Sequence, residues 1–282
     1  MKLTLIQLKN LQNNDANLNH AVEMIDKAAA AGTDFIVLPE MFSCPYKTSK
    51  FPLYAQEEGG SNWKLLSDAA KRNGVYLAAG SMPELEVSRD CCEHVEKIYN
   101  TSYVFDRNGN QIAKHRKVHL FDVDIKGGQR FKESDSLSAG NQITTFDTEF
   151  GKFGLMICFD IRFPEMARRM ESEGARLIIV PAAFNMTSGP RWWELMFRSR
   201  AVDNQLFMCG CSPARDEKAS YIAWGHSIAV DPWGEILGQL DIEEDMLTVE
   251  IDFEKINQFR QQVPLISAKR TDLYQVIIQY PV

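Results

Sequence analysis

The sequence has no long apolar segment and no strongly basic stretch. No part of its 282 residues approaches the roughly 18 consecutive apolar residues that a membrane-spanning helix requires, so we expect no membrane partner. Asp and Glu outnumber Lys and Arg by 38 to 31, which gives a formal net charge of −7. Surfaces that bind nucleic acid carry a basic stripe, and the densest basic stretch, residues 114–117, is too short for one. We therefore expect a small-molecule partner and no nucleic acid.

The chain also lacks the pattern of an export signal. Lys2 is followed by apolar residues that alternate with polar ones, without an extended apolar core or a small-residue cleavage site, so we expect a strand here and a cytoplasmic protein. The six cysteines are then expected to be reduced thiols. A zinc site built from Cys44, Cys91, Cys92 and His94 is not favoured, because adjacent cysteines are poorly spaced for tetrahedral ligation. We predict neither a metal nor a cofactor.

Short apolar segments alternate with amphipathic segments along the chain, which predicts an α/β fold with helices covering the sheets. A hairpin signal, DRNGN at 106–110, adds antiparallel pairing and makes the sheets mixed. No Pro-, Ser- or Gly-rich linker interrupts the pattern, so we expect one domain over 1–282. Strands are predicted at 3–8, 35–38, 75–80, 98–105, 111–114, 153–157, 177–180, 206–211, 226–230, 235–240 and 247–251, and helices from about 14 to 31, at 61–72, from 164 and at 192–202.

Two of these apolar strands end at residues that can carry chemistry. FIVLPE ends at Glu40 and FGLMIC ends at Cys158. The carboxyl ends of strands in α/β sheets open into the ligand crevice. A carboxylate and a thiol that met there would form a general base beside a sulfur nucleophile.

Each residue also has a plain structural interpretation. A lone glutamate after a strand usually caps a loop, and most free cysteines are small buried hydrophobic residues, as we expect of Cys209 and Cys211. Glu40 differs because it follows an apolar run and Pro39, where partial desolvation suits a general base. Cys158 differs because the charged turn after it enters a helix, whose N-terminus favours a thiolate.

A thiol that attacks a carbonyl also needs a positive or hydrogen-donating group at the developing oxyanion. The segment KHRKVHLFD at 114–122 supplies lysines, although a solvated basic cluster is the default interpretation. Spacing alone does not select Lys117 over Lys114.

Together, these motifs resemble the nitrilase superfamily of carbon–nitrogen hydrolases. LPEMF, HRKVHLFD and MICFDIRFPE occur in that superfamily's order of Glu, Lys and Cys, and the resemblance extends from LTLIQL to TDLY at 271–274. It implies that Glu40, Lys117 and Cys158 are catalytic and that Glu133, in RFKES, is the second glutamate of the family. It also implies a four-layer αββα sandwich with mixed sheets, and homodimers.

Within the superfamily, the sequence is most similar to the omega-amidase branch. The similar stretches are KVHLFDVDI, AAFNMTSGPRWWEL, RSRAVDNQ and SPARDEKASYIAWGHS. That branch hydrolyses the terminal amide of small 2-oxo dicarboxylic acid monoamides (2-oxoglutaramate and 2-oxosuccinamate). Deaminated-glutathione amidases and N-carbamoyl amidohydrolases share the same catalytic residues and stay as alternatives. The segment 87–96, VSRDCCEHVE, is interpreted as an inserted polar loop.

The resemblance implies hydrolysis through a cysteine thioester. Glu40 would accept the thiol proton of Cys158. Lys117 and the backbone N–H of Phe159 would stabilise the oxyanion, and Glu133 would orient Lys117 or the substrate amide.

The carboxylate of a 2-oxo acid also needs partners in the pocket. Tyr46 and the turn at Thr187 are candidates by resemblance. Arg162 could pair with the carboxylate through two parallel hydrogen bonds, but an arginine near a helix start pairs as readily with Asp160 or Glu165, and we favour that structural role.

Two other functional classes compete with the hydrolase. A cysteine protease of the papain type needs a histidine base, for which His119 and His226 are available, but the motif around its cysteine is missing. A non-enzymatic binding module has no need for Glu40, Lys117 and Cys158 together, and all three are present.

Overall fold

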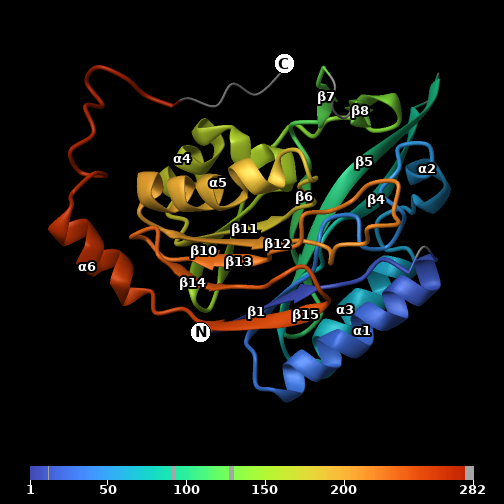
Figure 1. Ribbon diagram of the computed structural model, residues 1–282, viewed down its shortest axis with the longest axis horizontal. Coiled ribbons are helices and arrows are strands. Elements are labelled where there is room, and N and C mark those ends of the chain that lie inside the picture. The colour runs from blue at the N-terminus through green and yellow to red at the C-terminus, as the bar shows by residue number, and fades with distance from the viewer. Residues whose placement is uncertain (12, 91–92, 127–129, 277–282) are drawn as a thin grey trace.

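Two mixed β-sheets stack face to face and carry helices on both outer surfaces (Figure 1). This arrangement is seen in a computed structural model, which describes residues 1–11, 13–90, 93–126 and 130–276. None of the helices in the part of the chain so described is long and apolar enough to cross a membrane.

The first sheet has the strand order β15-β1-β2-β3-β5-β4, with β6 paired to β5. β1, β2 and β3 run parallel, whereas β15, β5, β4 and β6 pair antiparallel with their neighbours. The strands are β1 (Lys2–Gln7), β2 (Phe35–Val37), β3 (Tyr76–Ala78), β4 (Met82–Asp90), β5 (Glu93–Phe105), β6 (Gln111–Arg116) and β15 (Asp245–Glu250).

The second sheet has the order β14-β13-β12-β11-β10-β9, with a parallel centre of β10, β11 and β12. Its strands are β9 (Thr144–Thr148), β10 (Gly151–Leu155), β11 (Leu177–Pro181), β12 (Phe207–Cys211), β13 (Ile228–Val230) and β14 (Ile236–Gln239). A separate hairpin is formed by β7 (Asp122–Asp124) and β8 (Arg130–Lys132).

The helices are divided between the two outer layers. α1 (Asn14–Ala30) and α3 (Ser61–Asn73) cover the first sheet, and α4 (Pro164–Ser172) and α5 (Gly189–Asn204) cover the second (Figure 1). Shorter or peripheral helices are α2 (Phe51–Tyr54), η1 (Glu133–Asp135), η2 (Cys158–Arg162) and α6 (Glu254–Gln262).

Three apolar layers hold the four structural layers together. Residues such as Val37 and Phe153 fill the space between the sheets. Ile25 of α1 and Leu66 of α3 belong to the apolar layer between these helices and the first sheet, and Phe197 of α5 belongs to the layer on the second sheet. Each layer removes a continuous set of fully buried side chains from water, which is the main driving force for stacking the sheets. The predicted αββα sandwich with mixed sheets is confirmed.

One expectation from the sequence needs correction. The segment 87–96 is not an inserted loop, because β4 and β5 pair continuously from Met82↔Thr101 to Asp90↔Glu93 and form one long hairpin; Cys91 and Cys92 lie outside the described residues. The strand predicted at 247–251 is present. It is β15, which crosses to the first sheet and pairs with β1, because alternation predicts a strand but not its partner.

Candidate active site

Glu40 lies in a tight turn after β2, and its neighbours fix the turn closely. Met41 has a positive φ of 50°, and its N–H donates to the Ser81 hydroxyl at 3.1 Å. Gly80, with φ of 58°, packs against the turn so closely that a Cβ atom would come within 2.2 Å of the Pro39 carbonyl oxygen. Only glycine fits at position 80, so close backbone packing fixes the turn that carries Glu40.

Cys158 follows β10 at the start of the short helix η2 and also has a positive φ, of 44°. An L-residue with a side chain adopts this conformation only where its surroundings hold it. Its side chain is buried, with 6% exposed. Burial and the charge of Glu40 raise the pKa of the Cys158 thiol well above its ordinary value, against the opposing effects of Lys117 and the Ala183 N–H. The helix predicted from 164 is α4, and the short helix η2 lies between Cys158 and its start, so the influence of that helix on the thiol stays a prediction.

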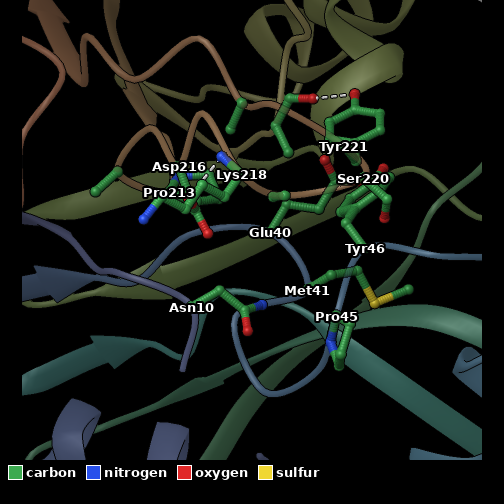
Figure 2. A pocket seen from close by; sticks show the side chains of 14 residues that line it. Asn10, Glu40, Met41, Pro45, Tyr46, Pro213, Asp216, Lys218, Ser220 and Tyr221 are labelled. Carbon is green, nitrogen blue, oxygen red and sulfur yellow. Dashed lines mark hydrogen bonds between the residues drawn. The ribbon is translucent and has the colours of Figure 1, made fainter. Parts of the chain in front are cut away.

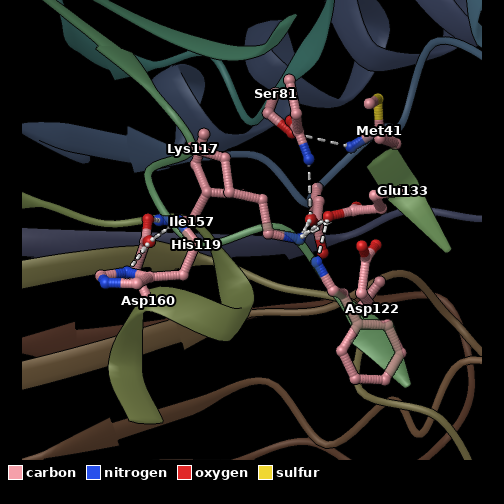
Figure 3. Close-up of polar contacts among 12 residues, drawn as sticks. Met41, Ser81, Lys117, His119, Asp122, Glu133, Ile157 and Asp160 are labelled. Atoms are coloured by element: carbon pink, nitrogen blue, oxygen red, sulfur yellow. Dashed lines mark hydrogen bonds and ion pairs between the residues drawn. The ribbon is translucent and has the colours of Figure 1, made fainter. Parts of the chain in front are cut away.

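Lys117 follows β6 and is completely buried between two glutamates, of which Glu133 is labelled beside it in Figure 3. Its ammonium group lies 2.9 Å from Oε1 of Glu40 and 2.9 Å from Oε2 of Glu133. Burial alone lowers the pKa of Lys117, but the charges of Glu133, Glu40 and Cys158 outweigh it and raise the pKa above its ordinary value. The lysine is therefore a fixed cation, and Lys114 instead pairs with Glu58 and Glu84 away from this site.

The two carboxylate oxygens of Glu40 have different surroundings. Oε1 accepts hydrogen bonds from Lys117 Nζ and from Asn100 Nδ2, both at 2.9 Å. Oε2 is buried and accepts no hydrogen bond from the described residues. Buried polar atoms normally have a hydrogen-bond partner, so Oε2 is the oxygen of Glu40 that is left available to a group entering the site.

Glu133 supports Lys117 from the other side. Its Oε2 accepts the Phe121 N–H at 2.7 Å, and its Oε1 accepts the Tyr46 hydroxyl at 3.0 Å. Burial raises the pKa of Glu133; the charge of Lys117 opposes this shift and that of Glu40 adds to it. Because the Tyr46 hydroxyl has one proton and donates it to Glu133, it can only accept a hydrogen bond from another group.

A cavity of about 270 Å³ opens beside Glu40 (Figure 2). In the close-up, Glu40 lies centrally, with Tyr46 and Tyr221 on one side and Asp216 and Lys218 on the other. Cys158 is not in the lining, but Ala183 is, and its N–H donates to the Cys158 sulfur. The thiol therefore lies directly behind the cavity wall. The lining is formed by Asn10, Glu40, Met41, Pro45, Tyr46, Ala183, Pro213, Ala214, Asp216, Lys218, Ala219, Ser220, Tyr221 and Ala223.

Thr187 and Arg162 lie outside this lining. The Thr187 N–H donates to the Asn185 side chain at 3.0 Å and helps to form the turn before α5. The expected pairing of Arg162 with Asp160 or Glu165 is not found in the described residues. Its guanidinium instead lies over aromatic rings, 4.4 Å from the Trp192 ring centre, because the surrounding pocket is aromatic rather than acidic.

The Phe159 N–H lies at the start of η2 and is the predicted backbone donor to the oxyanion. The first hydrogen bond of η2 runs from the Asp160 N–H to the Ile157 carbonyl at 3.1 Å. The Phe159 N–H precedes it, at the helix start where N–H groups have no acceptor within the helix. Phe159 directly follows Cys158 in the chain, and the oxyanion role of its N–H stays a prediction.

Sequence reasoning missed Asn100, Lys218 and Tyr221. Asn100 lies inside β5 in a stretch without a motif, so nothing in its neighbourhood indicates that it contacts Glu40. Lys218 and Tyr221 belong to SPARDEKASYIAWGHS, which the resemblance marked as a segment without assigning roles to its residues.

The histidines and possible metal ligands give no competing centre. His119 Nδ1 bonds to Asp160 at 2.8 Å, and His226 Nδ1 faces the Leu240 carbonyl, so neither is placed as a base for Cys158. No group of three or more His, Cys, Asp or Glu side chains that could hold a metal occurs within residues 1–11, 13–90, 93–126 and 130–276.

Comparison with known proteins gives consistent results. The profile of the carbon-nitrogen hydrolase family matches residues 2–261. Omega-amidase NIT2-A of Xenopus laevis is 46% identical over 98% of this chain and 97% of its own length, and omega-amidase NIT2 of Mus musculus is 45% identical over 99% of both. The crystal structure of Saccharomyces cerevisiae Nit3, a member of branch 10 of the nitrilase superfamily, has a TM-score of 0.87 and 42% identity and covers 96% of both chains.

Proposed function

The chain belongs to the carbon-nitrogen hydrolase family and is an amidohydrolase, and on this premise we propose that it is an omega-amidase. It would hydrolyse the terminal amide of 2-oxoglutaramate or 2-oxosuccinamate to the 2-oxo acid and ammonia. The observation that carries the proposal is the unpartnered Oε2 of Glu40 beside the buried thiol of Cys158. The small cavity favours these compact amides over the larger deaminated glutathione.

The proposed mechanism begins with attack by the thiol. Oε2 of Glu40 removes the proton from Cys158 as the sulfur bonds to the amide carbon. Because the thiol pKa is raised, proton transfer and attack occur together rather than from a resting thiolate. Lys117 and the Phe159 N–H stabilise the negative oxygen of the tetrahedral intermediate, and one such donor is commonly worth about 10²–10³ in turnover.

Collapse of the intermediate breaks the carbon–nitrogen bond. Glu40 returns its proton to the departing nitrogen, ammonia leaves and the acyl group stays on Cys158 as a thioester. Glu40 then takes a proton from water while the hydroxide bonds to the thioester carbon. When the carbon–sulfur bond breaks, the same proton returns to sulfur. Glu133 keeps Lys117 in place throughout, and Lys117 remains protonated.

Lys218 is proposed to hold the carboxylate of the substrate. It lies in the cavity lining and is exposed, and none of the described carboxylates pairs with its ammonium group. Lys218→Gln should raise the KM for 2-oxoglutaramate about 10-fold, since a charge-assisted hydrogen bond at a partly exposed site is worth one to two kcal/mol. The kcat should change little, because Lys218 does not contact the reacting amide. Initial-rate kinetics over a range of substrate concentrations measure both values.

Two controls make this test specific. Lys64→Gln removes another exposed lysine, on α3, and should leave the KM unchanged. A neutral amide substrate such as butyramide should show the same KM with wild-type protein and with Lys218→Gln. An equal rise in KM for the neutral amide would show that Lys218 shapes the cavity rather than binding charge.

We also propose that the protein is a homodimer. The outer layer of the second sheet exposes Trp192 and Leu195 on α5 and Met186 just before it, with 54% of Leu195 accessible. Burying this apolar surface in a second copy would remove it from water. Sedimentation velocity at micromolar concentration should give the mass of two chains, and Leu195→Glu should give one. A monomeric wild type would contradict the proposal.

A cytoplasmic location is part of the same proposal. Cys44, Cys158, Cys209 and Cys211 are all free, which suits a reducing compartment. Cell fractionation with detection of the chain tests the location directly.

A further inference from the structure

Asp160 is a buried carboxylate two residues after Cys158, and the mechanism above does not use it. It is fully buried and accepts four hydrogen bonds. Its Oδ2 accepts the Ile157 N–H and His115 Nε2, both at 3.0 Å. Its Oδ1 accepts the His119 N–H at 2.9 Å and His119 Nδ1 at 2.8 Å. Although burial raises the pKa of Asp160, the hydrogen bonds from His115, His119 and Ile157 outweigh it and keep the pKa well below its ordinary value.

The partners of Asp160 belong to two separate parts of the site. His115 and His119 stand two residues before and two residues after Lys117. Ile157 directly precedes Cys158. One carboxylate therefore connects the segment that carries the lysine with the turn that carries the thiol, and Figure 3 shows His119 and Asp160 on one side of Lys117 with Glu133 on the other.

The turn after Cys158 needs such support because its backbone is strained. The positive φ of Cys158 is a conformation that a residue with a side chain keeps only where neighbouring groups fix it. On the far side of the turn, Arg200 Nε donates to the Ile161 carbonyl at 2.9 Å. The His119 ring also stacks on Phe163 with ring centres 3.6 Å apart. Asp160 is the member of this set that bonds to both the turn and the Lys117 segment.

We propose that Asp160 is a positioning residue that sets the distance and orientation between the Cys158 thiol and the Lys117–Glu40 pair. It touches neither substrate nor reacting atoms and acts through Ile157, His115 and His119. The inference rests on the proposed roles of Cys158 and Lys117. A misplacement of about 1 Å between reacting groups can cost about 100-fold in rate, so loss of this link should affect turnover rather than substrate binding.

Asp160→Asn tests the proposal, because it keeps the shape of the side chain but replaces one accepting oxygen with an NH₂ group that faces existing donors. We expect kcat for 2-oxoglutaramate to fall 10- to 100-fold with KM within about twofold of the wild type. His119→Gln keeps its backbone bond to Asp160 and should give a smaller loss. Alkylation of Cys158 by iodoacetamide, which needs no assigned substrate, should also slow several-fold.

Glu171→Gln is the matched control. Glu171 is a buried carboxylate on α4, held by Lys269 at 2.7 Å and Arg260 at 3.4 Å, and it contacts no residue of the site. Its variant should lower the melting temperature but leave kcat and alkylation unchanged. All rates are measured at a temperature where circular dichroism shows each variant fully folded.

The outcomes separate this inference from the proposed function. Wild-type kcat and alkylation rates in Asp160→Asn would overturn the positioning role while leaving the amidase intact. An unchanged kcat with a raised KM would overturn the positioning role as well, because the loss would then lie in substrate binding. If wild-type protein releases no ammonia from 2-oxoglutaramate, the substrate is wrong, and the alkylation rates of the two variants still decide the role of Asp160.

Discussion

Cys158→Ala is expected to abolish ammonia release from 2-oxoglutaramate while leaving the fold intact. Without the sulfur no thioester can form, and water in its place has neither the nucleophilicity nor the fixed position of the thiol. Loss of a covalent nucleophile in a comparable hydrolytic site costs about 10⁶-fold in kcat. The measurement is ammonia release by wild-type and variant protein, together with a mass spectrum of acid-quenched wild-type protein, which should show an acyl adduct at Cys158.

Cys209→Ala is the matched control for this result. Cys209 is another fully buried free cysteine, in β12, and it packs between the two sheets rather than beside Glu40. Its variant should keep full activity and lose a few degrees of melting temperature, because only a small core contact is removed. More than a trace of activity in Cys158→Ala would contradict the covalent mechanism. If wild-type protein releases no ammonia from 2-oxoglutaramate but forms adducts with other amides, the proposed substrate is wrong and the covalent mechanism stands.

The sequence predicts the layers and the main reacting groups because both leave local signals. Glu40 and Cys158 each end an all-apolar strand, and the ends of strands in an α/β fold are where side chains can face a crevice. The strand-length apolar runs and the hairpin at 106–110 are likewise local features that survive in the structure. The resemblance adds Lys117 and Glu133, which spacing alone does not single out.

The remaining features depend on contacts between distant segments. Asn100 and Glu40 are 60 residues apart, and only the placing of β5 in the same sheet as β2, with β3 between them, brings their side chains within 2.9 Å. The raised pKa of Cys158 likewise depends on how deeply the thiol is buried, which no local pattern reports. The pairing of β15 with β1 joins two segments that are far apart in the sequence, and alternation of apolar residues does not indicate which strands pair.

Glu40→Gln is expected to lower turnover about 10³- to 10⁴-fold, because a general base contributes up to about 10⁴ and this one serves both halves of the reaction. The amide keeps the size of the side chain and can still accept a hydrogen bond from Lys117 through its oxygen. It cannot take a proton from the thiol or from water. Both thioester formation and its hydrolysis should therefore be slow, so rapid mixing should show no initial burst of ammonia. Glu84→Gln, which alters a buried carboxylate paired with Arg116 outside the cavity, should retain activity.

Glu40→Gln should also lower the pKa of the Cys158 thiol, which makes the thiolate easier to form although the variant is less active. The charge of Glu40 raises the pKa of the thiol, so removing that charge while Lys117 stays protonated should lower it. The pH at which iodoacetamide alkylation of Cys158 reaches half its maximum rate should fall in Glu40→Gln. If Glu40→Gln has a lower Cys158 pKa and is still inactive, turnover depends on proton transfer to Oε2 during the attack. It would not depend on a thiolate that is already formed before substrate binds. A normal burst in Glu40→Gln would instead confine Glu40 to hydrolysis of the thioester, and an unchanged titration would mean that Glu40 does not act on the thiol at all.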